Sequence, residues 1–288
     1  MAKGQTTHVR SVLELNLAML FISTSGVLGR HIDMPVPVII CFRAILAGCI
    51  LFLFCKWKKI SFKIESKDRL SVIAGGILMG LHWITYFYSL KMSNVAIGML
   101  SLFTYPVITS FLEPLVLKVK FQKMHLVLGA LVLIGIYFLV PDFSLENSYA
   151  KAVGVGVFSA FCYALRNLIM KTKVGVYHGS MLMWYQLVIM SVLLLPAIFI
   201  MDSSRIVSQL PYILVLALLT TAIGHTMFLY SLKRFSTTTA SIIGSVQPVY
   251  GIILGIVFLK EYPEYSTIIG GILILTSVVI ESVRSYKK

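Results

Sequence analysis

Tyr88-Ser89-Leu90-Lys91 recurs 142 positions later as Tyr230-Ser231-Leu232-Lys233. The same spacing relates Pro106-Val107 to Pro248-Val249, with no insertion between the two motifs. It also holds for residues further along, namely Leu112 with Leu254, Leu117-Lys118 with Leu259-Lys260, and Gly129, Leu131 and Leu133 with Gly271, Leu273 and Leu275. Because apolar sequence produces Leu and Val matches by chance, the tetrapeptide, the prolines and the glycines are the stronger evidence. The sequence therefore predicts an internal duplication.

The chain around these motifs is strongly apolar. Of its 288 residues, 58% are hydrophobic and 12% are charged, and the mean hydropathy is +0.90. Soluble domains contain about 25% charged residues, whereas a transmembrane helix needs about 20 consecutive apolar residues. An all-α membrane protein is therefore predicted, with ten transmembrane helices at residues 12–29, 36–55, 70–90, 95–115, 125–140, 152–170, 180–200, 211–232, 238–259 and 266–283.

Each copy of the duplication contains five predicted helices, in residues 1–141 and 150–288. Because five is odd, the second copy must enter the membrane from the opposite side, which makes the repeat inverted. Inverted repeats are characteristic of secondary transporters, since two related halves can open one central site alternately to each face.

The net charge of +14 is explained mainly by orientation. With both termini in the cytoplasm, the inner tails and loops contain 18 Lys and Arg residues and the outer loops contain five: Arg30, Lys91, Lys151, Arg205 and Lys260. This distribution is typical of the positive-inside rule. Residues 56–69 could also bind anionic lipid, but orientation accounts for their charge, and no nucleic-acid partner is expected.

Ionisable residues within transmembrane helices cost about 2.5–3.5 kcal/mol each, so they are candidates for function. Arg43 lies eight positions into the second predicted helix and is expected to face the interior, either joining helices or binding an anionic substrate group. Arg166 lies near a helix end, so we expect its side chain to extend to the interface. Glu14 and Glu113 lie near cytoplasmic ends. Each either faces the interface, couples transport to protons or binds a substrate amine.

His82 and His225 occupy nearly equivalent positions in the two copies. Each is either a neutral, hydrogen-bonded imidazole, or a pH-sensitive gate or substrate contact. Neighbouring aromatic residues, among them Trp83 and Tyr86, either pack within the bundle or line a cavity for an amphipathic organic molecule.

Pro106 and Pro248 occupy equivalent positions and are expected to break or hinge their helices, which frees backbone carbonyl groups. Paired helix breaks in the two halves of a transporter indicate its binding site, and a simple packing kink at each proline is the alternative. The predicted cavity lining therefore includes the neighbouring polar residues Thr104, Tyr105, Ser245 and Gln247.

The sequence contains no phosphate-binding loop, zinc-protease motif or nucleophile elbow, and its four cysteines lack metal-site spacing. We therefore expect a protein that is not an enzyme and that uses no metal and no cofactor.

Several motifs resemble the EamA type of the drug/metabolite transporter superfamily. They are Phe42-Arg43-Ala44, residues 96–106 and 236–248, Leu259-Lys260-Glu261 and Gly270-Gly271. The first copy departs from the pattern, because Val119 stands at the position equivalent to Glu261. The resemblance implies a secondary carrier of a bacterial inner membrane, often an exporter of amino acids, other metabolites or drugs, and leaves the cargo and proton coupling open.

We therefore expect alternating-access export of a small organic metabolite, with an amino acid as one candidate. The expected cavity is lined by the first, third, fourth, sixth, eighth and ninth predicted helices. One rival is a proton-coupled exporter of the multidrug type. Another is a membrane-embedded enzyme or a scaffold that moves no solute, which the inverted repeat and the absent motifs disfavour. The expected partners are a small-molecule substrate and the lipid bilayer, and the oligomeric state stays open.

Overall fold

The computed structural model of the chain describes residues 2–118, 120–140, 147–235, 240 and 243–286, with side chains between residues 11 and 280. Every regular element in this described part is a helix. Seven helical segments in it are long and apolar enough to cross a membrane, and α6, α12 and residues 265–280 of α13 are shorter apolar helices. The expectation that these three helices also cross the membrane stays a prediction.

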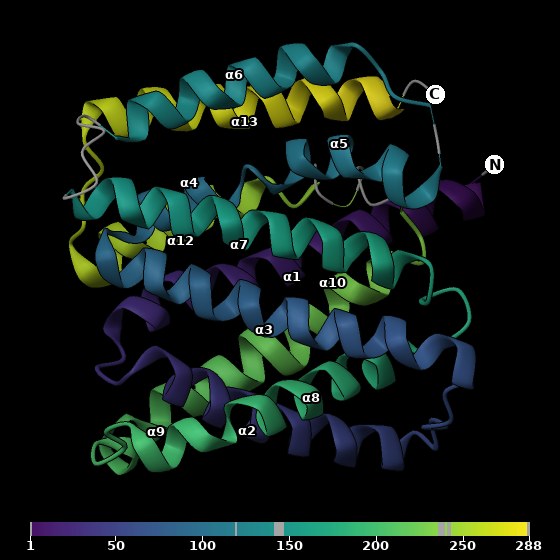
Figure 1. The fold of residues 1–288 in the computed structure, drawn as a ribbon. Coiled ribbons are helices and arrows are strands. Elements are labelled where there is room, and N and C mark those ends of the chain that lie inside the picture. The colour runs from purple at the N-terminus through teal and green to yellow at the C-terminus, as the bar shows by residue number, and fades with distance from the viewer. Residues whose placement is uncertain (1, 119, 141–146, 236–239, 241–242, 287–288) are drawn as a thin grey trace.

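The helices follow the predicted order (Figure 1). The predicted first copy contains α1 (Ala2–His31), α2 (Val36–Trp57), η1 (Ser66–Asp68), α3 (Arg69–Met92), α4 (Val95–Leu102), α5 (Tyr105–Leu117) and α6 (Met124–Leu139). The second contains α7 (Ser148–Lys171), α8 (Gly179–Ile200), α9 (Ile206–Val215), η2 (Leu216–His225), α10 (Thr226–Ser231), α12 (Val246–Leu259) and α13 (Tyr265–Tyr286).

The predicted helix at 95–115 is divided in two. α4 ends at Leu102, and α5 begins at Tyr105, so Pro106 is the second residue of the new helix. Pro248 is likewise the third residue of α12. The first amide groups of a helix have no intrahelical acceptor, so a proline there removes no helical hydrogen bond. The break before α5 therefore precedes Pro106, and neither proline frees a carbonyl within a continuous helix.

Helices from the two predicted copies pack directly against each other. α2 packs on α8 and α6 packs on α13, and in each pair the partners are repeat equivalents. α3 packs on α7, and the equivalent elements η2 and α1 also pack together. Figure 1 shows α6 and α13 at one side of the bundle, α2, α8 and α9 at the other, and α1, α3, α7 and α12 between them. The centre of the bundle is thus built from both halves of the chain.

The contact between α6 and α13 requires glycine. A Cβ atom on Gly270 would lie 2.6 Å from the carbonyl oxygen of Gly135, and one on Gly135 would lie 3.0 Å from the carbonyl oxygen of Gly270. Small residues at helix contacts in membranes allow such close backbone approach. This pair therefore sets the spacing of the two helices.

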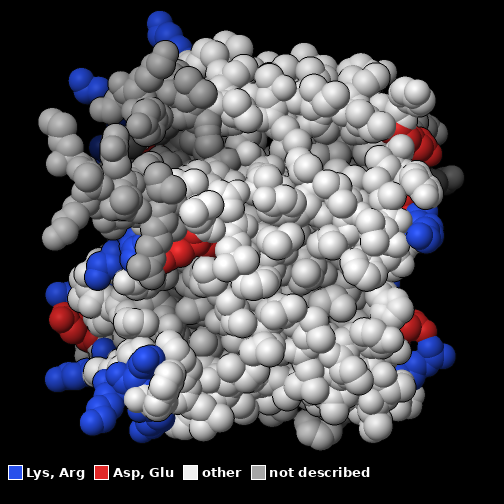
Figure 2. Space-filling view, turned by 180° about the vertical axis from the view of Figure 1, so that it is seen from behind, with Lys and Arg blue, Asp and Glu red and all other residues white. Residues whose placement is uncertain are grey.

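Charged residues gather at the ends of the helices, and the sides of the bundle are apolar (Figure 2). Large side chains such as Leu53, Leu133 and Phe199 are exposed on these sides, which suits contact with lipid. We call one end the cation-rich end. It contains the α2–α3, α7–α8 and post-α10 segments, whose basic residues are Lys56, Lys58, Lys59, Lys63, Lys67, Arg69, Lys171, Lys173, Lys233 and Arg234.

Candidate functional site

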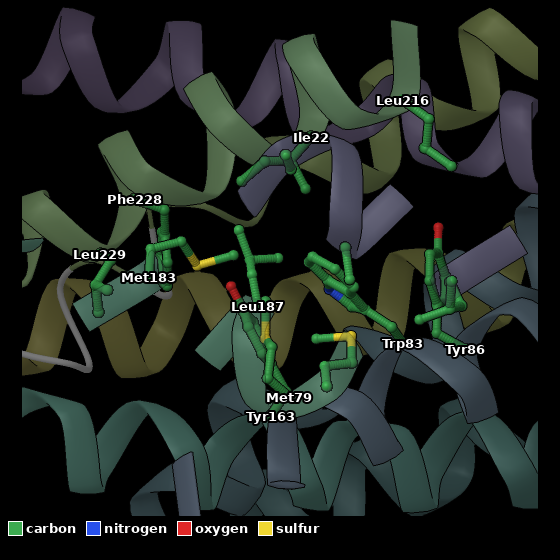
Figure 3. Close-up of a cluster of buried hydrophobic side chains, with 14 of the residues drawn as sticks. Ile22, Met79, Trp83, Tyr86, Tyr163, Met183, Leu187, Leu216, Phe228 and Leu229 are labelled. Atoms are coloured by element: carbon green, nitrogen blue, oxygen red, sulfur yellow. The ribbon is translucent and has the colours of Figure 1, made fainter. Parts of the chain in front are cut away.

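A central cavity lies where helices of the two copies meet. Its volume is about 10 Å³, which is room for about one water molecule. Figure 3 shows part of its aromatic wall, with Trp83 and Tyr86 from α3 and Tyr163 from α7. The full lining comprises Ile22, Ser25, Arg43, His82, Trp83, Tyr86, Leu102, Phe103, Tyr105, Tyr163, His225 and Gln247.

Arg43 is the charged residue of this cavity. Its side chain is only 1% exposed, and its guanidinium carbon lies 3.6 Å from the centroid of the Trp83 ring. Its Nε donates a hydrogen bond of 2.6 Å to Thr221 Oγ1, whereas its Nη2 is buried without a partner. Among the described residues, no carboxylate forms an ion pair with Arg43. An uncompensated positive charge therefore faces the cavity.

The acceptor of Arg43 stands on an unusual helix. η2 is a π-helix, a wide form that is often found at functional sites. Thr221 Oγ1 donates to the carbonyl oxygen of Leu216, five residues earlier, at 3.2 Å. Because this bond uses the hydroxyl hydrogen, a lone pair of the same oxygen is left to accept from Arg43. The wide turn thus positions the guanidinium.

His82 is held in one tautomer by Ser159. Ser159 Oγ donates to the backbone carbonyl of His82 at 2.8 Å and also lies 2.8 Å from His82 Nδ1. A hydroxyl has only one hydrogen, so both bonds form together only when Nδ1 carries a hydrogen and donates to Oγ. His82 Nε2 is then an acceptor.

Two further nitrogens of the cavity are buried without hydrogen-bond partners, Trp83 Nε1 and His225 Nδ1. The rings of these residues lie 5.2 Å apart, centroid to centroid. Buried polar atoms nearly always have partners, so unpaired ones that gather around a single cavity mark it as a candidate binding site. With Arg43 Nη2, they form a polar surface within an apolar wall.

A second, larger cavity lies at the cation-rich end, and we call it the vestibule. Its volume is about 260 Å³, and its lining includes Glu14, His178 and Arg234. Arg234 Nη1 donates to Glu14 Oε2 at 2.9 Å and to Ser11 Oγ at 2.8 Å. Burial, together with the positive charge of Lys233, lowers the pKa of His178, so this imidazole is neutral at pH 7.

An ion pair also joins the two halves of the chain at the opposite end. Arg30 Nε donates to Glu261 Oε1 at 2.9 Å, and Arg30 Nη1 donates to the carbonyl oxygen of Lys91 at 3.0 Å. Glu261 Oε2 accepts the amide hydrogen of Val95 at 2.8 Å, in the first turn of α4. Glu261 thus connects α1, α4 and the end of α12.

Comparison with known proteins agrees with this architecture. The sequence profile of the EamA-like transporter family matches residues 10–140 and 150–283, which is most of the chain. The chain belongs to the EamA-like transporter family. It is therefore a member of the drug/metabolite transporter superfamily and a multi-pass membrane protein.

Curated relatives of this EamA-like chain include the threonine/homoserine exporters RhtA of Salmonella typhimurium strains SL1344 and LT2. Each is 25% identical over 259 residues, which cover 87% of this chain and 83% of the relative. A solved crystal structure of another protein matches with a TM-score of 0.71 and 14% identity, over 97% of this chain and 98% of that one. That similarity concerns the fold alone.

Most of the predicted site residues of this EamA-like chain line the central cavity. They are Arg43, His82, Trp83, Tyr86, Tyr105, His225 and Gln247. Thr104 and Ser245 do not line it. The Thr104 hydroxyl donates to the carbonyl oxygen of Ser101 at 2.8 Å, and Ser245 directly precedes α12. Glu14 lines the vestibule, and Glu113 is half-buried in α5.

The expectation for Arg166 was wrong. Its side chain does not extend to the interface but is fully buried. Arg166 Nε donates to Gln186 Oε1 at 2.7 Å, and its Nη1 donates to Asn167 Oδ1 at 2.9 Å. These amide oxygens replace the water that a surface arginine would bind. Position near a helix end therefore misled the prediction, because the side chains of Gln186 and Met183 reach Arg166 from α8.

Three important residues were missed in the sequence. Tyr163 lies centrally, with ring centroids 4.4 Å from His82 and 4.9 Å from Tyr105. Thr221 and Ser159 orient Arg43 and His82, as described above. Their only sequence signal was a polar group within an apolar helix, which in membranes is common for packing alone.

Proposed function

We propose that this chain is a secondary-active exporter of a small zwitterionic metabolite, with amino acids as the first class to test. The family and the relatives named as threonine/homoserine exporters support a membrane transporter and favour this cargo. The cargo occupies the central cavity and leaves by alternating access.

One observation carries the choice of cargo: the buried, unpaired Nη2 of Arg43 beside the unpaired Nε1 of Trp83. An isolated buried charge is costly, and a carboxylate with matching hydrogen-bond acceptors offsets that cost. His82 Nε2, as an acceptor, suits the ammonium group of the same zwitterion. The aromatic walls accommodate the remaining apolar part.

The arrangement of the cavities supports the transport cycle. The central cavity is nearly filled, the Glu14–Arg234 pair borders the vestibule at one end, and the Arg30–Glu261 pair joins the copies at the other. In the proposed cycle, one pair separates to admit the substrate and the other separates to release it. The packing of equivalent helices against each other supports two inverted five-helix repeats, in residues 1–141 and 150–288, as the moving halves.

We assign the cation-rich end, with both termini, to the cytoplasm, because Lys and Arg concentrate in inner loops. All ten apolar helices cross the membrane in this proposal. The relatives come from a bacterium, which favours a bacterial inner membrane as the location.

The test is counterflow in proteoliposomes that are preloaded with pools of amino acids or nucleosides. We expect labelled amino acid to exchange, and we expect Arg43→Gln to lower the exchange at least tenfold. Arg43→Lys keeps the positive charge but lacks the planar guanidinium group, so this variant should retain only part of the exchange activity. Arg205→Gln is the matched control, because it removes an arginine from an exposed ion pair with Asp33 and should leave exchange unchanged.

Absence of exchange from every pool, by folded and inserted protein, would overturn the proposal and favour the multidrug, enzyme or scaffold alternatives. Exchange of nucleosides but not amino acids would overturn the cargo class alone.

A proton-coupled multidrug exporter is the second candidate, and the location of Glu14 in the vestibule favours it. It requires a carboxylate that takes up a proton on the transport path. Glu14→Gln and Glu113→Gln should then abolish the response of transport to a pH gradient. Unchanged pH dependence in both variants excludes coupling through these two residues.

A further inference from the structure

A groove that the transport cycle does not use lies at the cation-rich end, between the α2–α3 segment, the start of α3 and α8. Its volume is about 470 Å³. Its walls include Phe62, Lys63, Arg69, Ile73, Tyr185 and Ile189. We call it the basic groove.

The groove holds two uncompensated cations. Lys63 and Arg69 are exposed, and neither forms an ion pair within the described part of the chain. The acidic residues of the same segment are engaged elsewhere: Glu65 pairs with Lys67 at 2.7 Å, and Asp68 pairs with Lys173 at 2.7 Å. The groove therefore attracts an external anion.

The remainder of the groove is apolar and open to lipid. Ile73 and Ile189 lie along α3 and α8, and the face of α3 outside the groove exposes Leu70 and Ile77. A free inorganic anion would leave this apolar surface uncovered. The shape and chemistry together suit an amphiphile with an acidic head and a hydrocarbon chain.

The groove is also held in shape. The Tyr185 hydroxyl donates to the carbonyl oxygen of Phe62 at 2.7 Å, and the amide of Glu65 donates to the Tyr177 hydroxyl at 3.2 Å. The Phe62 ring packs edge-on against Trp184, with centroids 4.7 Å apart. These contacts fix the α2–α3 segment to α8, so the two cations belong to a built site and not to a free basic tail.

We propose that the basic groove binds one anionic phospholipid, with the phosphate between Lys63 and Arg69 and one acyl chain between α3 and α8. The lipid connects α3, which carries His82 and Trp83, to α8. It stabilises the folded protein because it binds only when these helices are packed.

The full chain in detergent is titrated with dioleoyl phosphatidylglycerol or dioleoyl phosphatidylcholine. Binding is measured by native mass spectrometry, and stability by melting temperature. We expect one retained phosphatidylglycerol and a rise in melting temperature that phosphatidylcholine does not give. Lys63→Gln/Arg69→Gln should weaken phosphatidylglycerol binding at least fivefold and remove the rise, and Lys63→Gln alone should give an intermediate loss. Lys58→Gln/Lys59→Gln, which removes the same charge outside the groove, should bind as the wild type does.

Equal binding of both lipids would overturn the proposal, as would an equal loss in the control variant or unchanged binding in Lys63→Gln/Arg69→Gln. Glycerophosphoglycerol, the headgroup without acyl chains, distinguishes a phospholipid from a soluble phosphate compound as the ligand. Protection by the headgroup at the same concentration would assign the groove to a soluble anion and overturn the lipid assignment.

Discussion

The guanidinium of Arg43 stacks on the ring of Trp83, with 3.6 Å between the guanidinium carbon and the ring centroid. A desolvated cation–π contact of this kind is worth about 2 kcal/mol. It partly offsets the burial of the charge but uses none of the guanidinium hydrogens. The stacking therefore fixes the position of Arg43 and leaves Nη2 available to a ligand.

Thr221→Val should weaken substrate binding, because it removes the acceptor of Arg43 Nε while keeping the shape of the side chain. An unpaired buried donor costs about 1–3 kcal/mol, so we expect lower stability and a raised KM in counterflow. Thr220→Val is the control, since the Thr220 hydroxyl bonds to Thr24 and not to Arg43. An equal rise in KM in both variants would contradict the positioning role of Thr221.

The Glu14–Arg234 pair should control the rate of exchange more than stability. Both side chains are more than a third exposed, and such pairs contribute at most about 1 kcal/mol to folding. Glu14→Arg or Arg234→Glu should slow exchange several-fold through like-charge repulsion, and the swapped double variant should recover much of the rate. A double variant as slow as either single variant would rule out a gate made by this pair.

Gly270→Ala should lower the melting temperature by several degrees. The added Cβ would lie 2.6 Å from the carbonyl oxygen of Gly135, so α6 and α13 must separate. Gly154→Ala in α7 is the control, because its Cβ would meet no atom within 4 Å, and alanine favours the helix by about 1 kcal/mol. Thermal unfolding in detergent measures the melting temperature of both variants. A Gly270→Ala protein as stable as the wild type would contradict the close approach of α6 and α13.

The hydrogen bond to Asp68 raises the pKa of Tyr177 above its ordinary value. The folded protein therefore holds this proton at a pH where the unfolded chain has released it. The stabilisation is complete below about pH 10, the ordinary tyrosine pKa, and is lost as the pH rises through the folded-state pKa. The wild type should then lose stability above pH 10 more steeply than Tyr177→Phe.

Tyr265→Phe serves as the matched control for this experiment, since Tyr265 is 88% exposed. Its melting temperature should follow the wild type at every pH. Parallel alkaline curves for the wild type and Tyr177→Phe would show that the Asp68–Tyr177 bond contributes nothing to the pH dependence.

Hydropathy and repeat spacing were sufficient to predict the order of the helices, because both are properties of the chain alone. The interior location of Arg43 could be predicted for the same reason, since its side chain is too deep to reach water. The buried location of Arg166 could not be predicted, because its environment depends on Gln186, which reaches it from a different helix. The roles of Thr221 and Ser159 were also hidden, since each depends on a partner more than 70 positions away along the chain.

One long helix, α1, takes part in two of the ion pairs that join the two halves of the chain. Glu14 and Arg30 both belong to α1, about 24 Å apart along its axis at about 1.5 Å per residue. A carrier leaks and dissipates the gradient that drives it when its binding site is open to both sides of the membrane at once. In the proposed transport cycle, α1 tilts as a rigid body and moves Glu14 and Arg30 in opposite directions, so one entrance closes while the other opens.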